Sequence, residues 1–487
     1  MKFHGHYIHN QWIKGSGTIF KSLNPATTRA VWKGFEANAQ DVIFAVKSAR
    51  EVSLNWRSLS FSDRQKYILE FQSILEKNRD ELAEIISKET GKPTWEANQE
   101  VSASINKIKI SIAAYKDRTN IKKIKKGDTV SVTRHMAHGV IAVIGPFNFP
   151  LHLPNGHIIP ALLAGNTIIF KPSEFTPLVA EFYIKLWNKV NLPNGVLNMI
   201  QGGRMTGEFL VTHPDINGCF FTGSSNTGIW LSRLFGKSPE KILALEMGGN
   251  NPLIVSKVRN IKAAVSIIIK SAFITAGQRC TCARRLIMIE SKKNRQLLKL
   301  LKDSIPQIVV GPYFSKQQPF LGPLINKSIQ ETLLATQDML QGLGGNILVK
   351  MKNPHPKGFF LSPGLIDISL ISDRLDDEWF GPLLQVIWVD NLEQAILVAN
   401  DTEFGLAASI LSDTKSDYDR CLQELHAGLI NWNLPTTGAA SDAPFGGIGR
   451  SGNHRPSAKY AADYCAYPVA SMETKKVGVQ ELPGVSF

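Results

Sequence analysis

Short apolar runs that stop at polar or glycine-containing turns recur along this chain from residue 139 onward. Residues 140–144 (VIAVI) stop at Gly145, and residues 167–170 (TIIF) stop at Lys171. The segment between them, residues 157–164, has helical character and is closed by a Gly-Asn pair. Strands that alternate with helices in this way form βαβ units around a buried parallel sheet. The pattern therefore predicts an α/β fold.

Two further apolar runs, residues 219–221 and 242–245, extend the predicted sheet. Open parallel sheets bind their ligands at the carboxyl ends of the strands. The polar and glycine residues near these predicted ends are Asn148, Lys171, Glu174, Gly223, Ser224 and Glu246. Because such ends meet at one edge of a sheet, the sequence predicts a cofactor site there.

The remaining segments indicate how the chain is organised outside this sheet. Residues 62–90 are expected to form one helix, with Ser62 as its N-cap and Gly91 as its stop. Residues 121–137 alternate around a turn and predict a hairpin, whose exposed edge needs a covering strand. A second α/β region is expected over about residues 253–460, followed by a polar tail.

The composition is that of an ordinary folded protein, because 43% of the 487 residues are hydrophobic and 20% are charged. A net charge of +14 is one feature of nucleic-acid binders. No recognition motif accompanies the dispersed lysines, however, so we prefer a basic enzyme that attracts anionic substrates. The chain has neither a clean apolar run of membrane-spanning length nor an apolar signal region. We therefore expect a cytoplasmic protein with no nucleic-acid or membrane partner.

The cysteines and histidines do not predict a metal site or a disulfide framework. There are five cysteines, an odd number at wide spacing. Cys280 and Cys282 lack the second Cys or His pair that zinc requires. His4, His6 and His9 are interpreted as accidental residues of a frayed terminus.

Cys280 is a candidate nucleophile, because Arg279 beside it would favour the thiolate that attacks a carbonyl carbon. The alternative is a buried packing residue, which is our interpretation of Cys282. Glu246, at a Gly-Gly turn, could act as general base toward water. The amide of Asn148 could donate to a developing oxyanion, although a turn asparagine is the alternative.

Three segments have the composition of a dinucleotide site. Residues 221–228 (FTGSSNTG) follow a predicted strand and open a helix, whose N-terminus and glycines suit a pyrophosphate. They lack the G-x-G-x-x-G fingerprint, so an ordinary strand-to-helix turn is the alternative. Lys171 and Glu174 could hold ribose hydroxyls or form a loop ion pair. Glu378 and Phe380 could hold a ribose and pack on a nicotinamide, or form a core turn.

Taken together, these motifs resemble the aldehyde dehydrogenase superfamily over nearly the whole chain. The segments that carry the resemblance are PFNFP at 146–150, KPSE at 171–174, FTGS at 221–224, LEMGG at 245–249, GQRC at 277–280, EWFGP at 378–382, NDTEFGL at 400–406 and PFGG at 444–447. Asn250 and Gly449 stand where the superfamily usually has lysine. Both departures resemble one branch of the superfamily, as do residues 152–157, 279–285 and 452–458, so they bear on the substrate more than on the family.

The resemblance implies an NAD-dependent oxidation of an aldehyde. Cys280 would attack the aldehyde to give a thiohemiacetal, with the oxyanion held by Asn148 and the Cys280 N–H; Glu246 would then activate the water that releases the acid from a thioester. The implied NAD contacts are Lys171 and Glu174 at the adenosine ribose, Gly223, Ser224, Ser225, Asn226, Thr227 and Gly228 at the pyrophosphate, and Glu378 and Phe380 at the nicotinamide. The Glu174 carboxylate would repel a 2′-phosphate, which favours NAD over NADP.

The branch also implies a small-molecule, dianionic semialdehyde as substrate. Arg279, Arg284 and Arg455 are the candidate carboxylate partners, with a structural ion pair as the alternative for each. We favour Arg455, because it lies in a branch-specific run. The rival functions are oxidation of another anionic semialdehyde, acyl transfer to CoA, which needs no water-activating base, and a non-catalytic protein that keeps the fold.

The architecture that the resemblance implies has three parts. Residues 1–120 and 139–248 would form an NAD-binding domain on the parallel sheet, and residues 249–461 an α/β catalytic domain. Residues 121–138 and 462–487 would form a β oligomerisation arm. In this family the arm pairs with a partner subunit, so a homo-oligomer, dimer or tetramer, is expected.

Overall fold

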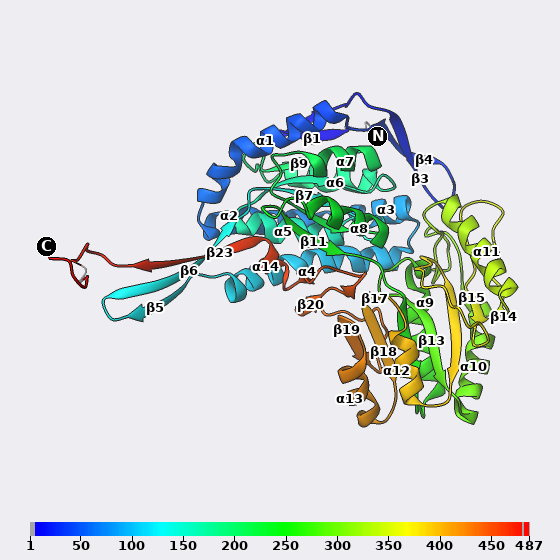
Figure 1. Ribbon diagram of the computed structural model, residues 1–487. Helices are drawn as coiled ribbons and strands as arrows, with labels where there is room; N and C mark the ends of the chain where they lie inside the picture. Colours follow the sequence, from blue (N-terminus) through cyan, green and yellow to red (C-terminus); the bar gives the residue numbers. More distant parts are fainter. Residues whose placement is uncertain (1–4, 480–481, 487) are drawn as a thin grey trace.

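The structure is a computed structural model that describes residues 5–479 and 482–486. Two seven-stranded sheets with their helices form two lobes, and a three-stranded arm projects from the first lobe (Figure 1). This is the α/β architecture that the alternating sequence pattern predicted. Within the described residues, no helix combines the length and the apolar character that crossing a membrane requires.

The first sheet is parallel over five strands and antiparallel at one edge, in the order β11-β10-β7-β8-β9-β1-β2. Its strands are β1 (His6–Ile8), β2 (Gln11–Ile13), β7 (Val140–Ile144), β8 (Thr167–Lys171), β9 (Leu197–Met199), β10 (Gly218–Thr222) and β11 (Ile242–Glu246). The four predicted apolar runs are β7, β8, β10 and β11. They are adjacent in the sheet, so their carboxyl ends meet as expected.

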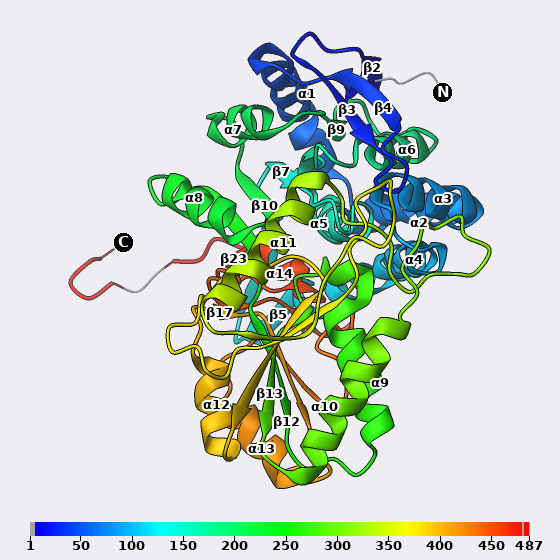
Figure 2. The ribbon, with the colours of Figure 1, turned by 90° about the vertical axis from the view of Figure 1, so that its right-hand side faces the viewer.

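The helices of the first lobe lie around this sheet (Figure 2). They are α1 (Ala39–Ser58), α2 (Phe61–Lys77), α3 (Arg79–Thr90), α4 (Thr94–Arg118), α5 (His152–Ala164), α6 (Pro177–Asn188), α7 (Arg204–Thr212), α8 (Ser225–Phe235) and the short α14 (Ala461–Tyr464). Helix α5 directly follows β7 through the PFNFP segment, and α8 directly follows β10. Both helices therefore begin at the edge where the strands end.

The single helix predicted over residues 62–90 is wrong, because α2 and α3 are separate helices. Asn78 lies between them, and its side-chain amide donates to a carbonyl in the last turn of α2 at 2.7 Å. The N-cap is Ser60 rather than Ser62, since the Ser60 side chain accepts a bond from a first-turn N–H. Gly91 ends α3 with a φ of 78°, as predicted.

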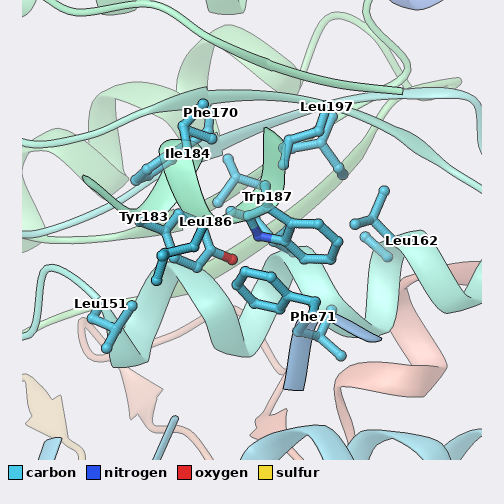
Figure 3. Packing of buried hydrophobic residues seen from close by; sticks show 14 of the residues in the cluster. Phe71, Leu151, Leu162, Phe170, Tyr183, Ile184, Leu186, Trp187 and Leu197 are labelled. Carbon is cyan, nitrogen blue, oxygen red and sulfur yellow. The ribbon is translucent and has the colours of Figure 1, made fainter. Parts of the chain in front are cut away.

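Aromatic side chains from α2 and α6 form part of the core beneath the sheet (Figure 3). The rings of Phe71 and Trp187 stack with centroids 3.7 Å apart, and Tyr183 meets Phe71 edge-on at 5.5 Å. Tyr183 also lies edge-on to Phe170 of β8. Each such ring pair adds about 0.5–1.5 kcal/mol beyond area burial. This packing fixes α6 against β8 and thereby fixes the carboxyl end of that strand.

The second sheet is parallel except for β14, in the order β14-β15-β16-β13-β12-β18-β19. Its strands are β12 (Asn251–Val255), β13 (Ala283–Ile289), β14 (Asn346–Val349), β15 (Gly364–Asp367), β16 (Leu383–Val389), β18 (Ala407–Leu411) and β19 (Leu429–Trp432). Its helices are α9 (Ile261–Phe273), α10 (Lys292–Ser304), α11 (Lys327–Gly342), α12 (Leu392–Asn400) and α13 (Lys415–Glu424), with short 3₁₀ turns at Ile274–Gly277 and Ile305–Gln307. A separate apolar core fills this lobe.

The arm contains the predicted hairpin, β5 (Lys122–Lys126) and β6 (Thr129–Ala137). The strand β23 (Ala466–Glu473) pairs with the other edge of β6, so the C-terminal segment of the same chain covers that edge. Three two-stranded sheets complete the described chain: β3 (Ile19–Leu23) with β4 (Ala30–Phe35), β17 (Phe404–Gly405) with β21 (Ile448–Gly449), and β20 (Pro444–Phe445) with β22 (Ser457–Ala458).

The interpretation of the N-terminal histidines as a frayed segment is wrong for the two that the structure describes; His4 lies outside the described residues. His6 is fully buried in β1, and its Nδ1 accepts a bond from the Gln201 N–H at 3.0 Å. His9 lies 3.1 Å from the hydroxyl of Ser48. Among the described residues, no group of three His, Cys, Asp or Glu side chains could hold a metal ion.

Candidate active site

The carboxyl ends of the first sheet border a cavity of about 640 Å³ that is completed by residues of the second lobe. Most residues predicted for catalysis and cofactor binding line it: Asn148, Lys171, Glu174, Gly223, Ser224, Asn226, Thr227, Glu246, Cys280, Glu378 and Phe380. Ser225 and Gly228 do not line it and lie inside the start of α8. The carboxyl ends of the strands therefore lie together at one edge of the sheet, as predicted.

The loop that carries Cys280 has a fixed and unusual backbone. Thr275 and Ala276 have positive φ angles of 57° and 52°, and Gly277 follows with 71°. A Cβ on Gly277 would lie 2.1 Å from the Gly381 carbonyl O, so only glycine fits there. This close contact joins the cysteine loop to the segment that carries Glu378 and Phe380.

Asn251 is a positioning residue that the sequence reasoning missed. Its side-chain amide donates to the carbonyl groups of Cys280 and Cys282, at 2.7 and 2.9 Å. Asn251 opens β12, directly after the Gly-Gly turn that follows Glu246. One amide side chain therefore holds the Cys280 loop against the start of β12.

The expected role of Arg279 in favouring the Cys280 thiolate is wrong. Burial raises the pKa of the Cys280 thiol well above its usual value, and the nearby carboxylates of Glu246 and Glu378 raise it further. The guanidinium of Arg279 instead forms an ion pair with Glu96 at 2.9 Å. Burial raises the pKa of Cys282, and the charges of Arg284 and Arg279 oppose that rise. Cys282 is buried, in agreement with our interpretation of it as a packing residue.

Glu246 is a buried carboxylate at the end of β11. Burial raises its pKa to about 7, while proximity of the Cys280 thiol and the Thr222 hydroxyl opposes the rise. Neither carboxylate oxygen has a partner at ordinary hydrogen-bond geometry among the described residues. A carboxylate with this pKa and free lone pairs is suited to accept a proton at neutral pH.

Residues from the C-terminal part of the second lobe support β11. The Asn453 side chain accepts from the Leu245 N–H at 2.9 Å and donates to the Leu243 carbonyl O at 2.8 Å. The Ser451 hydroxyl donates to the Gly248 carbonyl O at 2.7 Å. The branch-specific run that contains Asn453 thus holds the strand that ends in Glu246.

Asn148 is buried between β7 and α5, and its amide Nδ2 donates to the Gln278 carbonyl O at 2.9 Å. This bond orients the amide toward the loop that carries Cys280, and one N–H of the Nδ2 group remains for another acceptor. An amide N–H is the type of donor that an oxyanion hole uses.

Lys171 and Glu174 line the cavity but do not form the loop ion pair that was the alternative. The buried Lys171 ammonium donates to the carbonyls of Pro172 and Gly202, at 2.8 and 2.6 Å. Burial lowers the pKa of Lys171, and the negative charges of Glu174 and Glu36 oppose this shift. The Glu174 side chain is exposed at the cavity wall, where its carboxylate can reach a hydroxyl group.

The N-terminus of α8 borders the same cavity. Ser224 is its N-cap and accepts from the Thr227 N–H. A Cβ on Gly228 would lie 2.0 Å from the sulfur of Met247, so glycine lets this helix approach the end of β11. Exposed amides at a helix N-terminus favour an anion, which fits a pyrophosphate group.

Glu378 lies against the Gly-Gly turn after Glu246. Its Oε1 accepts from the Gly249 N–H at 3.2 Å, and a Cβ on Gly248 would lie 1.7 Å from Oε2. Burial raises the pKa of Glu378 to about 7. The ring of Phe380 lies edge-on to Phe147, with centroids 5.9 Å apart. The carboxylate and the aromatic ring thus border one part of the cavity.

A second cavity, of about 260 Å³, shares two lining residues with the first, namely Cys280 and Leu153. Of the three predicted substrate arginines, only Arg279 lines this cavity. Arg284 is buried and donates to carbonyl groups, including that of Gly277 at 2.7 Å. Arg455 is exposed and lines neither cavity, so the structure does not support its proposed contact with substrate.

The departures from the superfamily pattern have local partners. Asn250 donates to an Asp376 carboxylate oxygen at 2.8 Å. Gly449 has a φ of 57°, and a Cβ there would lie 2.4 Å from the Glu403 carbonyl O. A lysine at residue 449 would therefore be strained in this backbone.

Comparisons with known proteins agree with this site. The sequence pattern of the aldehyde dehydrogenase family matches residues 12–469. The N-succinylglutamate 5-semialdehyde dehydrogenase of Pseudomonas fluorescens (strain Pf0-1) is 51% identical over 468 residues, which cover 96% of each chain. An NAD+ complex of aldehyde dehydrogenase from Bacillus cereus is 27% identical, with a TM-score of 0.90 over 98% of this chain and 97% of that one. Lactaldehyde dehydrogenase from Escherichia coli is 26% identical, with a TM-score of 0.90 over 97% and 99% of the two chains. The superfamily predicted from the sequence is confirmed, and the chain belongs to the aldehyde dehydrogenase family.

Proposed function

We propose that this enzyme oxidises N-succinyl-L-glutamate 5-semialdehyde to N-succinyl-L-glutamate with NAD, as a step of arginine breakdown. The substrate is proposed from the relative that is 51% identical over 96% of both chains. The observation that carries the chemistry is the position of Cys280 at the junction of two cavities, with Glu246 beside it. One cavity has the features of a dinucleotide site, and the other leaves room for an aldehyde.

Cys280 begins the reaction by adding its sulfur to the aldehyde carbon, which forms a thiohemiacetal. Asn148 and the Cys280 backbone N–H donate to the oxygen that becomes negative in this step. Because the thiol has a raised pKa, its proton must leave as the carbon–sulfur bond forms, and the adjacent Glu246 carboxylate is the group that accepts it. Loss of the aldehyde hydrogen with its electron pair leaves a thioester on Cys280.

Glu246 completes the reaction by taking a proton from water. The water attacks the thioester carbon, the carbon–sulfur bond breaks, and the carboxylic acid leaves. Splitting the oxidation in this way replaces one difficult step by two easier ones. The alternative acceptor, CoA, would make the base unnecessary. The buried Glu246 carboxylate, which has no partner at ordinary hydrogen-bond geometry within the described part of the chain, therefore favours hydrolysis.

The hydrogen-bonding and aromatic groups that line the larger cavity suit NAD. The α8 N-terminus suits the pyrophosphate, Lys171 and Glu174 suit the adenosine ribose, and Glu378 with Phe380 suits the nicotinamide end. When bound, NAD supplies the two-electron acceptor for the oxidation. The Glu174 carboxylate disfavours a 2′-phosphate, so NAD is preferred to NADP.

The same proposal includes a cytoplasmic homo-oligomer. The arm projects from the body, and its outer strands β5 and β23 have no further strand partner among the described residues. Unpaired edges of this kind are normally covered. Residues 121–138 and 462–487 would form that oligomerisation arm, beside an NAD-binding domain of residues 1–120 and 139–248 and a catalytic domain of residues 249–461.

The test is NADH production by the purified enzyme with three aldehydes, namely succinylglutamate, glutamate and succinate semialdehydes. We expect the highest kcat/KM for succinylglutamate semialdehyde, without any need for CoA. A clear preference for another aldehyde would reject the substrate. Turnover that depends on CoA would reject hydrolysis.

A further inference from the structure

Lys107 is a buried cation in the wall of the second cavity, and it has no role in the oxidation steps of Cys280, Glu246 and Asn148. It lies on α4, its exposed fraction is 3%, and it lines the cavity that Cys280 also lines. Its ammonium group makes no hydrogen bond or ion pair within residues 5–479 and 482–486. Its stem packs near α5, where a Cβ on Gly156 would lie 3.6 Å from the Lys107 Cε.

The other charged groups around this cavity already have partners. Arg279 is paired with Glu96, and Lys92 is paired with Glu100 in a second buried ion pair. Glu100 also accepts bonds from two backbone N–H groups of the segment that enters α5. The charges within each of these pairs cancel, so Lys107 carries the one positive charge without a partner among the described residues around this cavity.

The titratable groups nearest to Lys107 do not supply a compensating charge. His152 and His157 of α5 have pKa values lowered to about 3, chiefly by burial and further by the Lys107 charge itself. Burial raises the pKa of Tyr464 and Cys465 well above the usual values, so both are neutral at physiological pH. A buried ammonium surrounded by neutral groups is costly unless a ligand pairs with it.

We propose that the Lys107 ammonium binds a carboxylate of the aldehyde substrate while the aldehyde carbon lies at Cys280. This inference rests on the proposed function and names the residue that selects anionic aldehydes. It replaces the arginines predicted from the sequence, because Arg279 and Arg284 are used by the protein itself and Arg455 lies outside the cavity. A lysine ammonium, as a compact point charge, can meet a carboxylate without the planar geometry that arginine needs.

The first test compares variants on α4 with two matched aldehydes, succinate semialdehyde and the uncharged butanal. For Lys107→Met we expect kcat/KM to fall about 10- to 100-fold with the anionic aldehyde, mainly through KM, since a hydrogen bond to a charged group is lost. The value for butanal should stay the same or rise. Lys107→Arg should retain most of the preference for the anion. The control is Lys109→Met, an exposed lysine on the same helix, which should change neither value.

A second test uses pH, which a purely structural lysine would not affect selectively. Burial lowers the pKa of Lys107 to about 8, so the ammonium is charged below that pH and is lost as the pH rises through it. The ratio of kcat/KM for succinate semialdehyde to that for butanal should therefore fall above about pH 8. In Lys107→Arg this fall should be absent up to pH 10, because arginine stays charged.

Equal losses with both aldehydes, or a ratio that does not change with pH, would overturn the role of Lys107. The two proposals fail separately. If the wild-type enzyme prefers a different anionic aldehyde and Lys107→Met still loses only anionic substrates, the substrate is wrong and the role of Lys107 stands. If succinylglutamate semialdehyde is preferred equally by wild type and Lys107→Met, the substrate stands and the role of Lys107 is rejected.

Discussion

At the scale of single residues, the charge of Glu246 affects both the attack by Cys280 and the hydrolysis of the thioester. The variant Glu246→Gln keeps the shape and removes a negative charge that raises the pKa of the Cys280 thiol. We therefore expect the first turnover to persist as a burst of NADH, while steady-state turnover falls about 10²–10⁴-fold because water has lost its base. Stopped-flow absorbance separates the two phases. The exposed Glu240 provides the control variant Glu240→Gln, and a full steady-state rate in Glu246→Gln would reject the base.

The sequence predicted the identities of the site residues better than their partners. Glu246 and Lys171 could be placed because each ends an apolar run in a βαβ pattern. Arg279 could not be interpreted correctly, since its partner Glu96 lies far away in the sequence and only the tertiary fold brings them together. Lys107 was missed, although a signal exists: it lies between the apolar residues Ile105 and Ile108, which are buried on the same helix.

At the scale of elements, the close approach of α8 to β11 depends on one glycine. In Gly228→Ala the new methyl group would lie 2.0 Å from the sulfur of Met247, whose side chain is itself buried, so we expect the start of α8 to shift away from β11. Overpacking of this kind costs about 1–3 kcal/mol, and we expect NADH to bind at least about tenfold more weakly in a fluorescence titration. Because the cysteine loop is separate, iodoacetamide should still label Cys280 at the wild-type rate.

The double variant Gly228→Ala/Met247→Ala tests the cause of that loss. Removing the methionine side chain makes room for the methyl group, so NADH affinity should recover relative to Gly228→Ala alone. Gly342→Ala is the matched control, because a Cβ there meets nothing within 4 Å. Weak binding that persists in the double variant would show that the contact with Met247 is not what positions α8.

Helices and strands could be predicted where one hydrophobic periodicity dominated the segment. They were harder to predict where a single local hydrogen bond determined the boundary of an element. The continuous apolar runs of β7 and β8 were sufficient to place both strands. The division between α2 and α3 could not be predicted, because the helical spacing of apolar residues continues through it. The side-chain bond of Asn78 at the end of α2 leaves no periodic pattern in the sequence. The arm hairpin was predicted from alternation, whereas its pairing with β23 brings together residues more than 300 positions apart.

At the scale of the whole molecule, the arm is expected to decide the state of assembly. Ile124 of β5 and Met472 of β23 have exposed fractions of 62% and 61%, on strands whose outer edges are open. Lysine at both positions adds charge to a surface that is already solvent-exposed in the single chain, so the fold should lose no more than about 0.5 kcal/mol per site. In an oligomer, however, the same lysines would have to be buried.

The prediction is therefore that the wild-type enzyme sediments as a dimer or tetramer and that Ile124→Lys/Met472→Lys sediments as a smaller species. The control is Leu370→Lys, which replaces an apolar residue that is 90% exposed in the second lobe and should leave the mass unchanged. Circular dichroism and NADH binding distinguish dissociation from unfolding, because the residues of this chain that line the cavity of about 640 Å³ lie outside the arm. A monomeric wild type, or a double variant of unchanged mass, would mean that the two exposed arm strands do not form the subunit contact.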